Sequence, residues 1–479
     1  MKDIRRLLLG SFFTLLASPL SAQNTGFGSA WLDLDAGEQT QVMDFAVDFK
    51  NFLGHARSEM WFVRDGITLA ESEGFRPWSP DIDPAQLAPG SRWYAVNRDR
   101  TLVLFIMGRL PLDEGLKIIN THIDSPRLEF KTVPLRDRNG VVTIDAQVHG
   151  GIKNYQWTNI PLGIIGRIDK RDGSTAWVEI GLDTDDPILL ISDLAPHVDS
   201  DYRDRTQRDV IATEELEPII GSLPAVPGSE LSLPSARLLA ILKDQYDIED
   251  SDLLSADLQI IPVTAPRDVG LDRALTAAYG QDNRSTAYVS LRAISEIDIP
   301  QQTVIAYAVN NEETSSWNTG VSSEWFNTLI AELIAASSGS FSDLDLRRTY
   351  ARSQVLVSDT TTALNPLFPQ PQNPQLTSRL GYGLVVKEYG PGREANSEYF
   401  AYIRGIFDEG DIRWQTHSYD AGYGGGTIAA WFAGQNMDVI DVGIGIVSMH
   451  SPYELSSKVD VWELFRGFQA FYQAESFQE

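Results

Sequence analysis

Short apolar runs rich in β-forming residues alternate with segments of helical periodicity along most of this chain. The apolar runs are Thr101–Ile106, Leu116–Ile119, Thr303–Ala308, Gln354–Val357 and Val439–Ile446. Strands without a polar face are typical of a sheet that is covered on both sides. Apolar residues recur at helical spacing in Gln39–Arg57, Ile67–Glu73, Thr286–Ile294 and Glu324–Ser337. The alternation predicts an α/β fold with helices on both faces of a sheet.

Residues from about 133 to 256 follow a different pattern. Alternating strands such as Val141–Val148 and Thr175–Ile180 are separated by Asp/Gly turns, and a proline-rich stretch covers Glu215–Pro234. We interpret residues 133–256 as a mostly-β domain inserted between the two parts of the α/β domain, residues 23–132 and 257–479. A length of 479 residues is consistent with two or three domains.

The chain contains no cysteine. This excludes a disulfide framework, Cys-ligated zinc, an iron–sulfur cluster and a thiol nucleophile, so any metal must be bound by His, Asp and Glu. The formal net charge is −27. A nucleic-acid partner requires a basic surface, and so acidic a chain also repels anionic lipid, so we expect neither as a partner.

The first 22 residues have the pattern of a secretory signal peptide. Lys2, Arg5 and Arg6 precede an apolar stretch from Leu7 to about Leu16, and small residues stand before Gln23. The apolar stretch is shorter than the roughly 20 residues that span a bilayer. We therefore expect a periplasmic or secreted protein without a membrane anchor. The alternative is an amphipathic first helix of a cytosolic protein.

Polar residues follow the apolar strands where these end, which is where open α/β sheets bind their ligands. The chain has no G-x-S-x-G elbow, phosphate loop or H-E-x-x-H helix. Instead, four strand ends carry His122 with Asp124, Glu312 with Glu313, Asp359, and His450. A lone histidine is more often structural, and two consecutive acids are more often a solvated turn, so each pattern alone is weak.

Taken together, these residues form the ligand set of a hard or borderline divalent metal such as zinc, manganese or cobalt. His122 and Asp124 lie two apart on an extended segment, so their side chains point the same way. Glu312 and Glu313 are expected to face opposite ways, one toward a metal and one toward the substrate water. Asp282, just before a helical segment, is a candidate for a carboxylate that bridges two metals.

Longer motifs make the chain similar to a known family. The motifs are THIDSPRLEFK (121–131), HGGIKNYQW (149–157), PILLISDLAPH (187–197), YGQDNRS (279–285), NNEETSS (310–316), VLVSDTTTALNP (355–366), NSEYFAYIR (396–404), GGGTIAAW (424–431) and DVGIGIVSMHS (441–451). In wording and order they resemble the aspartyl aminopeptidase family, the aminopeptidase I-type zinc exopeptidases. The resemblance implies a zinc-exopeptidase-like three-layer α/β/α catalytic domain with an inserted lid or dimerisation domain.

The resemblance also implies a role for each residue that falls in a matching motif. His122 would bind one metal and His450 the other, Asp282 would bridge them, and Glu313 and Asp359 would complete the ligands. Glu312 would be the general base, and Asp124 would orient His122. Substrate would be contacted by His197 from a neighbouring subunit, by Lys387 and, from its position near a glycine cluster, by His417. The cofactors would be two divalent ions, most simply zinc, and the protein would be a homo-oligomer built from dimers.

Some positions depart from the family pattern. Thr362 and Asn365 stand where the family has histidines, Asn310 where it has an acid, Glu394 where it has an aromatic residue, and Trp157–Pro161 differs from the family's Trp-Phe-Asp-Arg-Asp. These changes leave the preferred N-terminal side chain open. An exported metal-dependent aminopeptidase is therefore the leading hypothesis. A catalytically silent peptide-binding relative and a carboxypeptidase or amidohydrolase of related metal chemistry are the alternatives.

Overall fold

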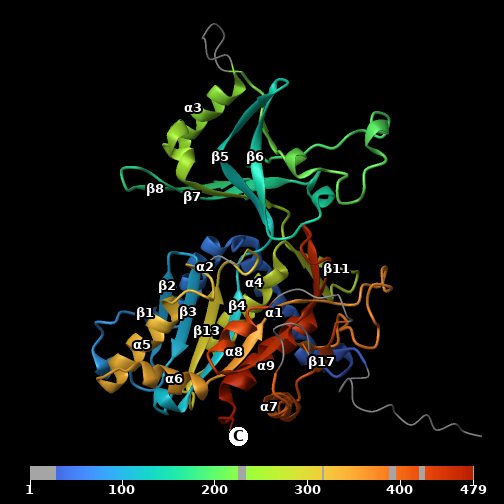
Figure 1. Ribbon diagram of the computed structural model, residues 1–479. Coiled ribbons are helices and arrows are strands. Elements are labelled where there is room, and N and C mark those ends of the chain that lie inside the picture. Colours follow the sequence, from blue (N-terminus) through green and yellow to red (C-terminus); the bar gives the residue numbers. More distant parts are fainter. Residues whose placement is uncertain (1–27, 225–232, 315–317, 388–394, 420–426, 478–479) are drawn as a thin grey trace, which may run out of the picture.

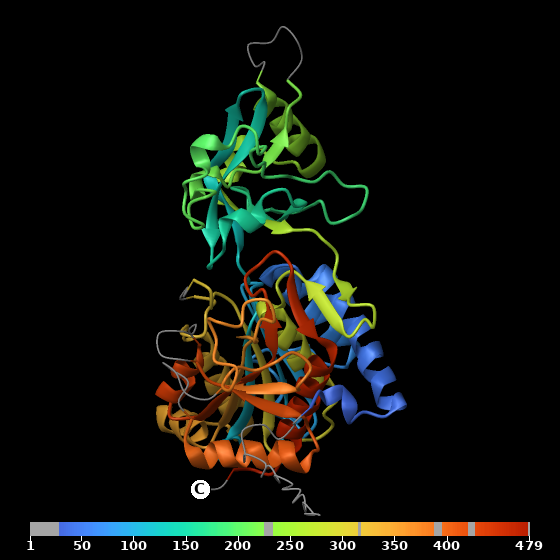
Figure 2. The ribbon, with the colours of Figure 1, turned by 90° about the vertical axis from the view of Figure 1, so that its right-hand side faces the viewer.

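The computed structural model describes residues 28–224, 233–314, 318–387, 395–419 and 427–477. This part of the chain forms two bodies, one above the other in Figures 1 and 2. The chain passes from the larger body to the smaller one at residues 123–126 and returns at 263–266. The predicted signal peptide, residues 1–22, lies outside the described residues.

The larger body is built on a mixed sheet with the strand order β1-β2-β3-β13-β4-β14-β18-β16-β17. Its strands are β1 (Arg76–Pro77), β2 (Arg92–Asn97), β3 (Thr101–Ile106), β4 (Leu116–His122), β13 (Thr303–Val309), β14 (Gln354–Ser358), β16 (Leu384–Lys387), β17 (Trp414–His417) and β18 (Asp438–Gly443). Strands β13, β4, β14 and β18, in the centre, run parallel. Their carboxyl ends therefore meet at one edge of the sheet.

Helices cover both faces of this sheet (Figure 1). One face carries α1 (Ala36–His55), α2 (Glu59–Ser72), α4 (Gln281–Ser295), α7 (Ser397–Glu409) and α9 (Lys458–Gln473), and the other carries α5 (Trp325–Ser338), α6 (Asp343–Ala351) and α8 (Ala429–Gly434). Strand β3 shows why both layers form, since Leu102 and Leu104 pack into the first layer while Val103 and Phe105 pack into the second. The predicted three-layer α/β/α class is confirmed.

Several predicted elements have different bounds in the structure, and two of them show the difference clearly. The helix expected at Ile67–Glu73 begins eight residues earlier, at Glu59, because the Ser58 side chain accepts a hydrogen bond from the Trp61 N–H and caps it. The strand expected at Val439–Ile446 is divided into β18 and β19 (Gly445–Val447). The last residue of β18 is Gly443, where the chain passes so close to the Asp359 carbonyl that a Cβ atom would lie 1.9 Å from its oxygen, so only glycine fits.

The smaller body, the inserted domain, is a sheet in the order β8-β7-β10-β5-β6-β9 with helix α3 (Pro234–Tyr246) packed on it. Its strands are β5 (Arg127–Arg138), β6 (Val141–His149), β7 (Leu162–Asp169), β8 (Thr175–Ile180), β9 (Ile219–Gly221) and β10 (Ala256–Pro262). The sheet thus begins before residue 133 and ends after residue 256. Its apolar core includes Trp61 of α2, which joins the two bodies.

A third, small sheet lies beside the main one and consists of β11 (Arg267–Val269), β12 (Leu275–Ala278), β20 (Glu454–Ser457), β19 and β15 (Thr361–Thr362). It connects the segments that enter α4 and leave β14. Among the described residues, none of the helices has both the length and the apolar character needed to cross a bilayer.

Candidate metal centre

Side chains from distant parts of the chain meet at the carboxyl edge of the main sheet. His122 is the last residue of β4, Asp359 follows β14, and Glu313 follows β13. Asp282 comes from the first turn of α4, and His450 from the loop between β19 and β20. The structure therefore brings together the five residues that the sequence predicts as metal ligands.

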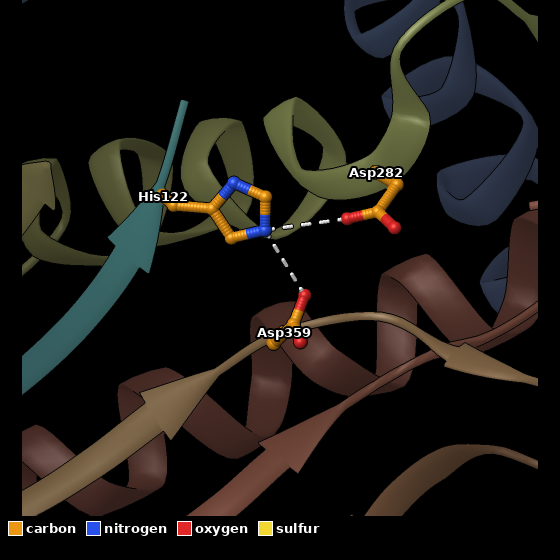
Figure 3. A group of neighbouring side chains, drawn as sticks. All are labelled: His122, Asp282 and Asp359. Carbon is orange, nitrogen blue, oxygen red and sulfur yellow. Dashed lines mark ion pairs between the residues drawn. The ribbon is translucent and has the colours of Figure 1, made fainter. Parts of the chain in front are cut away.

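The first group of donor atoms contains His122, Asp282 and Asp359 (Figure 3). His122 Nε2 lies 3.3 Å from Asp282 Oδ1 and 3.3 Å from Asp359 Oδ1. His122 and Asp282 are buried, and Asp359 is largely so.

The second group contains Asp282, Glu313 and His450. His450 Nε2 lies 3.2 Å from Asp282 Oδ2 and 3.2 Å from Glu313 Oε1. Asp282 thus belongs to both groups, and each of its two oxygens faces a different histidine.

The spacing and chemistry of these atoms fit bound metal. Four-coordinate zinc, with bonds of about 2.0–2.2 Å, holds its ligand atoms roughly 3.3–3.6 Å apart. The observed nitrogen-to-oxygen distances of 3.2–3.3 Å are close to this separation. Asp282 Oδ1 and Asp359 Oδ1 are buried and accept no hydrogen bond from the described residues. A divalent cation would satisfy these two oxygens.

Asp124 lies behind the first donor group and is fully buried. Its Oδ1 atom is 3.4 Å from His122 Nδ1 and accepts a hydrogen bond from the Glu312 N–H at 3.1 Å. Its Oδ2 atom accepts the Glu313 N–H at 3.2 Å and lies 3.0 Å from His149 Nε2. Burial alone would raise the pKa of Asp124, but the hydrogen bonds with the two histidines hold it far below its usual range.

Glu312 and Glu313 lie in a turn, so the expectation of an extended chain at this point is wrong. Asn311 has a φ of 61°, which turns the chain after β13, and both following N–H groups point at Asp124. Glu313 joins the second donor group, whereas Glu312 belongs to neither. Burial raises the pKa of Glu312 to about 7, with His122 opposing the shift and Asp359 adding to it.

Lys387 and His417 lie at the end of two adjacent strands, β16 and β17, where they are paired in register. Lys387 is buried and donates a hydrogen bond to Asp359 Oδ2 at 3.2 Å. His417 is also buried, with Nδ1 3.1 Å from the Ser378 hydroxyl. Lys387 therefore touches the first donor group directly, and His417 stands next to Lys387.

His197 belongs to the inserted domain. It is exposed on a loop of the inserted domain, between β8 and β9. Among the described residues of the single chain, the two donor groups do not include it.

The structure also shows the neighbours of most positions that depart from the family pattern. Asn310 is buried beside Thr319, Thr362 contacts the Met449 sulfur, and Asn365 accepts the Leu367 N–H. Trp157 is buried in the core of the inserted domain. Glu394 lies outside the described residues.

Two acids that support the site, Glu454 and Glu129, were not predicted from the sequence, and His149 was left without a role. Glu454 is buried and accepts the N–H groups of Asp282 at 3.0 Å and His450 at 2.7 Å, so it fixes the backbone of the shared aspartate and of the histidine in the second donor group. His149 lies between Asp124 and Glu129, with Nδ1 3.0 Å from Glu129 Oε1. The Gly-Gly pair after His149 was the available signal, but nothing local connects it with Asp124.

The surroundings of His149 predict a pH dependence of stability. Burial lowers its pKa, but the hydrogen bonds with Asp124 and Glu129 outweigh burial and the nearby Arg127 charge, and raise the pKa to about 9. Because the folded-state pKa lies above the unfolded value, the stabilisation is complete below about pH 6.5 and is lost as pH rises through 9. At about 1.4 kcal/mol for each pKa unit, the loss is up to about 3 kcal/mol.

This loss is measured by urea unfolding of the metal-free chain at pH 6 and at about pH 9.5, in the wild type and in His149→Gln. We expect the wild type to lose more stability than the variant. His55→Gln, at an exposed position of α1, is the matched control and should follow the wild type. Equal losses in the wild type and His149→Gln would contradict the prediction.

Comparison with known proteins agrees with the geometry. A family model described as aminopeptidase I zinc metalloprotease (M18) matches residues 53–472. A probable M18 family aminopeptidase 1 of Clostridium acetobutylicum is 36% identical over 456 residues, which cover 93% of this chain and 98% of that protein. The crystal structure of an M18 aminopeptidase from Thermotoga maritima is similar with a TM-score of 0.88 and 29% identity, covering 95% of this chain and 100% of that one. Aminopeptidase I from Clostridium acetobutylicum gives a TM-score of 0.86 and 34% identity over 94% of this chain and 99% of that one. The chain therefore belongs to the M18 family of aminopeptidase I zinc metalloproteases.

Proposed function

We propose that this M18 family member is an exported aminopeptidase that removes N-terminal residues from peptides with two divalent ions, most simply zinc. The observation that carries the proposal is Asp282, whose two oxygens face His122 and His450 separately. His122 and Asp359 would hold one ion, His450 and Glu313 the other, and Asp282 would bridge them. When bound, such a pair of ions lowers the pKa of water and polarises the scissile carbonyl.

Glu312 is suited to the role of general base. It follows the same strand as Glu313, is partly buried, and lies outside both donor groups, so its carboxylate is left for the attacking water. It would take a proton from that water and deliver it to the leaving amine. Asp124 would hold the His122 ring by its Nδ1 side, so that Nε2 faces the metal.

The acidic surroundings favour a substrate with a free N-terminal amine. Carboxylates of both donor groups and of Glu312 lie within one site, and a positively charged ammonium is attracted there. Lys387 and His417 would line the pocket for the first side chain of the substrate. His197, exposed on the inserted domain, would contact substrate in a neighbouring copy.

This function is tested with a panel of aminoacyl 4-nitroanilides, each offered with a free and with an acetylated N-terminus. We expect release of 4-nitroaniline from free substrates only, loss of the rate after chelation, and its return with zinc. A rate unchanged by acetylation would instead support the related carboxypeptidase or amidohydrolase chemistry. Bound metal without turnover of any substrate would support a silent peptide-binding protein.

Replacing Glu312 by glutamine tests the general base. The amide cannot take a proton from water, so kcat should fall by about 10²–10⁴ while metal content is retained. Glu409→Gln, at the exposed end of α7, is the control and should keep the wild-type kcat. A near-normal kcat in Glu312→Gln would remove Glu312 from this role.

Replacing Asp282 by alanine tests the shared ligand. Because both donor groups lose an oxygen, zinc content measured by mass spectrometry should fall at both positions, from two ions toward none per chain. Asp298→Ala, an exposed aspartate after α4, should keep both ions. Two fully retained ions in Asp282→Ala would show that Asp282 does not bridge.

We also propose a homo-oligomer built from dimers. The inserted domain leaves several apolar side chains exposed, including Trp177 (46%), Ile188 (52%), Leu194 (47%) and Val198 (63%), and these are candidates for a subunit interface. Light scattering of the purified protein measures the assembly, and a monomer would contradict it.

The proposed export rests on the N-terminal charge pattern, and N-terminal sequencing of the mature protein checks it, since Gln23 should come first.

A further inference from the structure

Three consecutive residues of the inserted domain contact the proposed metal site from above. β6 ends at His149, and Gly150 and Gly151 follow. Each of the three approaches a different residue of the site, and we refer to residues 149–151 as the contact segment.

His149 reaches the first donor group through Asp124. Both ring nitrogens are engaged, Nε2 at 3.0 Å from Asp124 Oδ2 and Nδ1 at 3.0 Å from Glu129 Oε1. With a partner on each side the ring cannot rotate without losing a contact, so it holds Asp124 in place. Asp124 in turn faces His122 Nδ1 and binds the N–H groups of Glu312 and Glu313.

The two glycines reach the second donor group directly. The Gly151 carbonyl oxygen lies 2.8 Å from His450 Nδ1, which leaves Nε2 of that ring toward Asp282 and Glu313. Gly150 has a φ of +73°, and a Cβ atom there would lie only 2.8 Å from Glu313 Oε2. A side chain at residue 150 would therefore collide with the Glu313 carboxylate, so glycine is what lets the segment pass this close to the second donor group.

The contact segment is itself fixed to the larger body. Arg127 pairs with His149 across the β5–β6 ladder and forms ion pairs with Glu129 at 2.8 Å and Glu59 at 3.5 Å. Glu59 opens α2 and accepts a hydrogen bond from Gln259 of β10 at 2.7 Å. All of these side chains except Glu129 are buried. The segment is thus held by a network that includes both bodies.

We propose that the contact segment positions the ligands of both metal ions, so that the inserted domain controls metal affinity as well as covering the site. This rests on the proposed two-metal site. His149 is a positioning residue, since it acts through Asp124 and does not itself face the metals. Hydrogen bonds to the far nitrogen of a metal-binding histidine fix its tautomer and orientation, and their loss typically weakens metal binding or activity about 10–100-fold. Here Nδ1 of His122 lies 3.1 Å from the Asp124 carbonyl oxygen and 3.4 Å from Asp124 Oδ1, and Nδ1 of His450 lies 2.8 Å from the Gly151 carbonyl oxygen. The partners of both histidines are therefore beside or within one short segment.

The test measures metal binding without substrate. Zinc affinity of the full chain is determined by chelator competition for the wild type, His149→Leu, His149→Gln and Gly150→Ala, and the absorption spectrum of the cobalt-loaded protein reports ligand geometry. We expect affinity to fall about 10–100-fold in His149→Leu and in Gly150→Ala, with an altered cobalt spectrum. His149→Gln, which retains one donor toward Asp124, should lie between the wild type and His149→Leu.

Matched controls separate positioning from general damage. His55→Leu makes the same change at an exposed histidine, and Gly140→Ala places alanine at a φ of +88° with no atom within 4 Å, at the other end of the same strand pair. Both should keep wild-type affinity and spectrum. Circular dichroism of the metal-free variants checks that each is folded. If His149→Leu is unfolded, Gly150→Ala and His149→Gln carry the test.

The outcomes separate this inference from the proposed function. Unchanged affinity and spectrum in folded His149→Leu and Gly150→Ala would overturn the positioning role even if the enzyme is active. If both variants bind zinc more weakly but the wild type hydrolyses none of the aminoacyl substrates, the positioning role is supported and the proposed activity is overturned. A wild type that binds no divalent metal would overturn both.

Discussion

The site depends above all on one buried carboxylate, that of Asp124. Removing a charge from water costs several kcal/mol unless partners compensate for it. Here two backbone N–H groups and two imidazole rings supply the compensation. The need to satisfy this single group places His122, the turn at Glu312 and Glu313, and His149 in one arrangement. Those residues come from three separate stretches of the chain, so Asp124 helps to fix the two bodies and the metal centre relative to one another.

The topology explains why the inserted domain stands over the site. The insertion leaves the main sheet a few residues after His122 and returns just before β11, which is followed by β12 and then Asp282. It is therefore placed in the sequence between two residues of the first donor group, and its base must lie beside that group. The contacts of His149 with Asp124 and of Gly151 with His450 follow from this position. From one strand end, the inserted domain thus contacts His450 directly and reaches His122 through Asp124.

Much of the fold was predictable because buried strands carry a local signal. Thr101–Ile106 and the run starting at Thr303 are apolar on both faces, and the structure places them as β3 and β13 in the middle of the sheet. At Glu312 and Glu313 an extended chain was predicted, but the structure has a turn. The prediction failed because the N–H groups of both residues donate hydrogen bonds to the distant Asp124 carboxylate. Glu454 gave no signal, since an acid four residues after a histidine is ordinary in sequence. It matters because its carboxylate accepts the N–H of Asp282, 172 positions away, as well as that of His450.

The sequence by itself determined the chemistry that is available. Without cysteine, a metal site can use only His, Asp and Glu, and such residues stand where the apolar strands end. Only the tertiary structure decided how they are shared. Asp282 faces His122 with one oxygen and His450 with the other, across 160 and 168 positions of sequence. His149 is fixed by partners that lie 20 residues or more away, Asp124 and Glu129. Such contacts depend on how strands and the inserted domain are arranged in space, and no local pattern of residues encodes that arrangement.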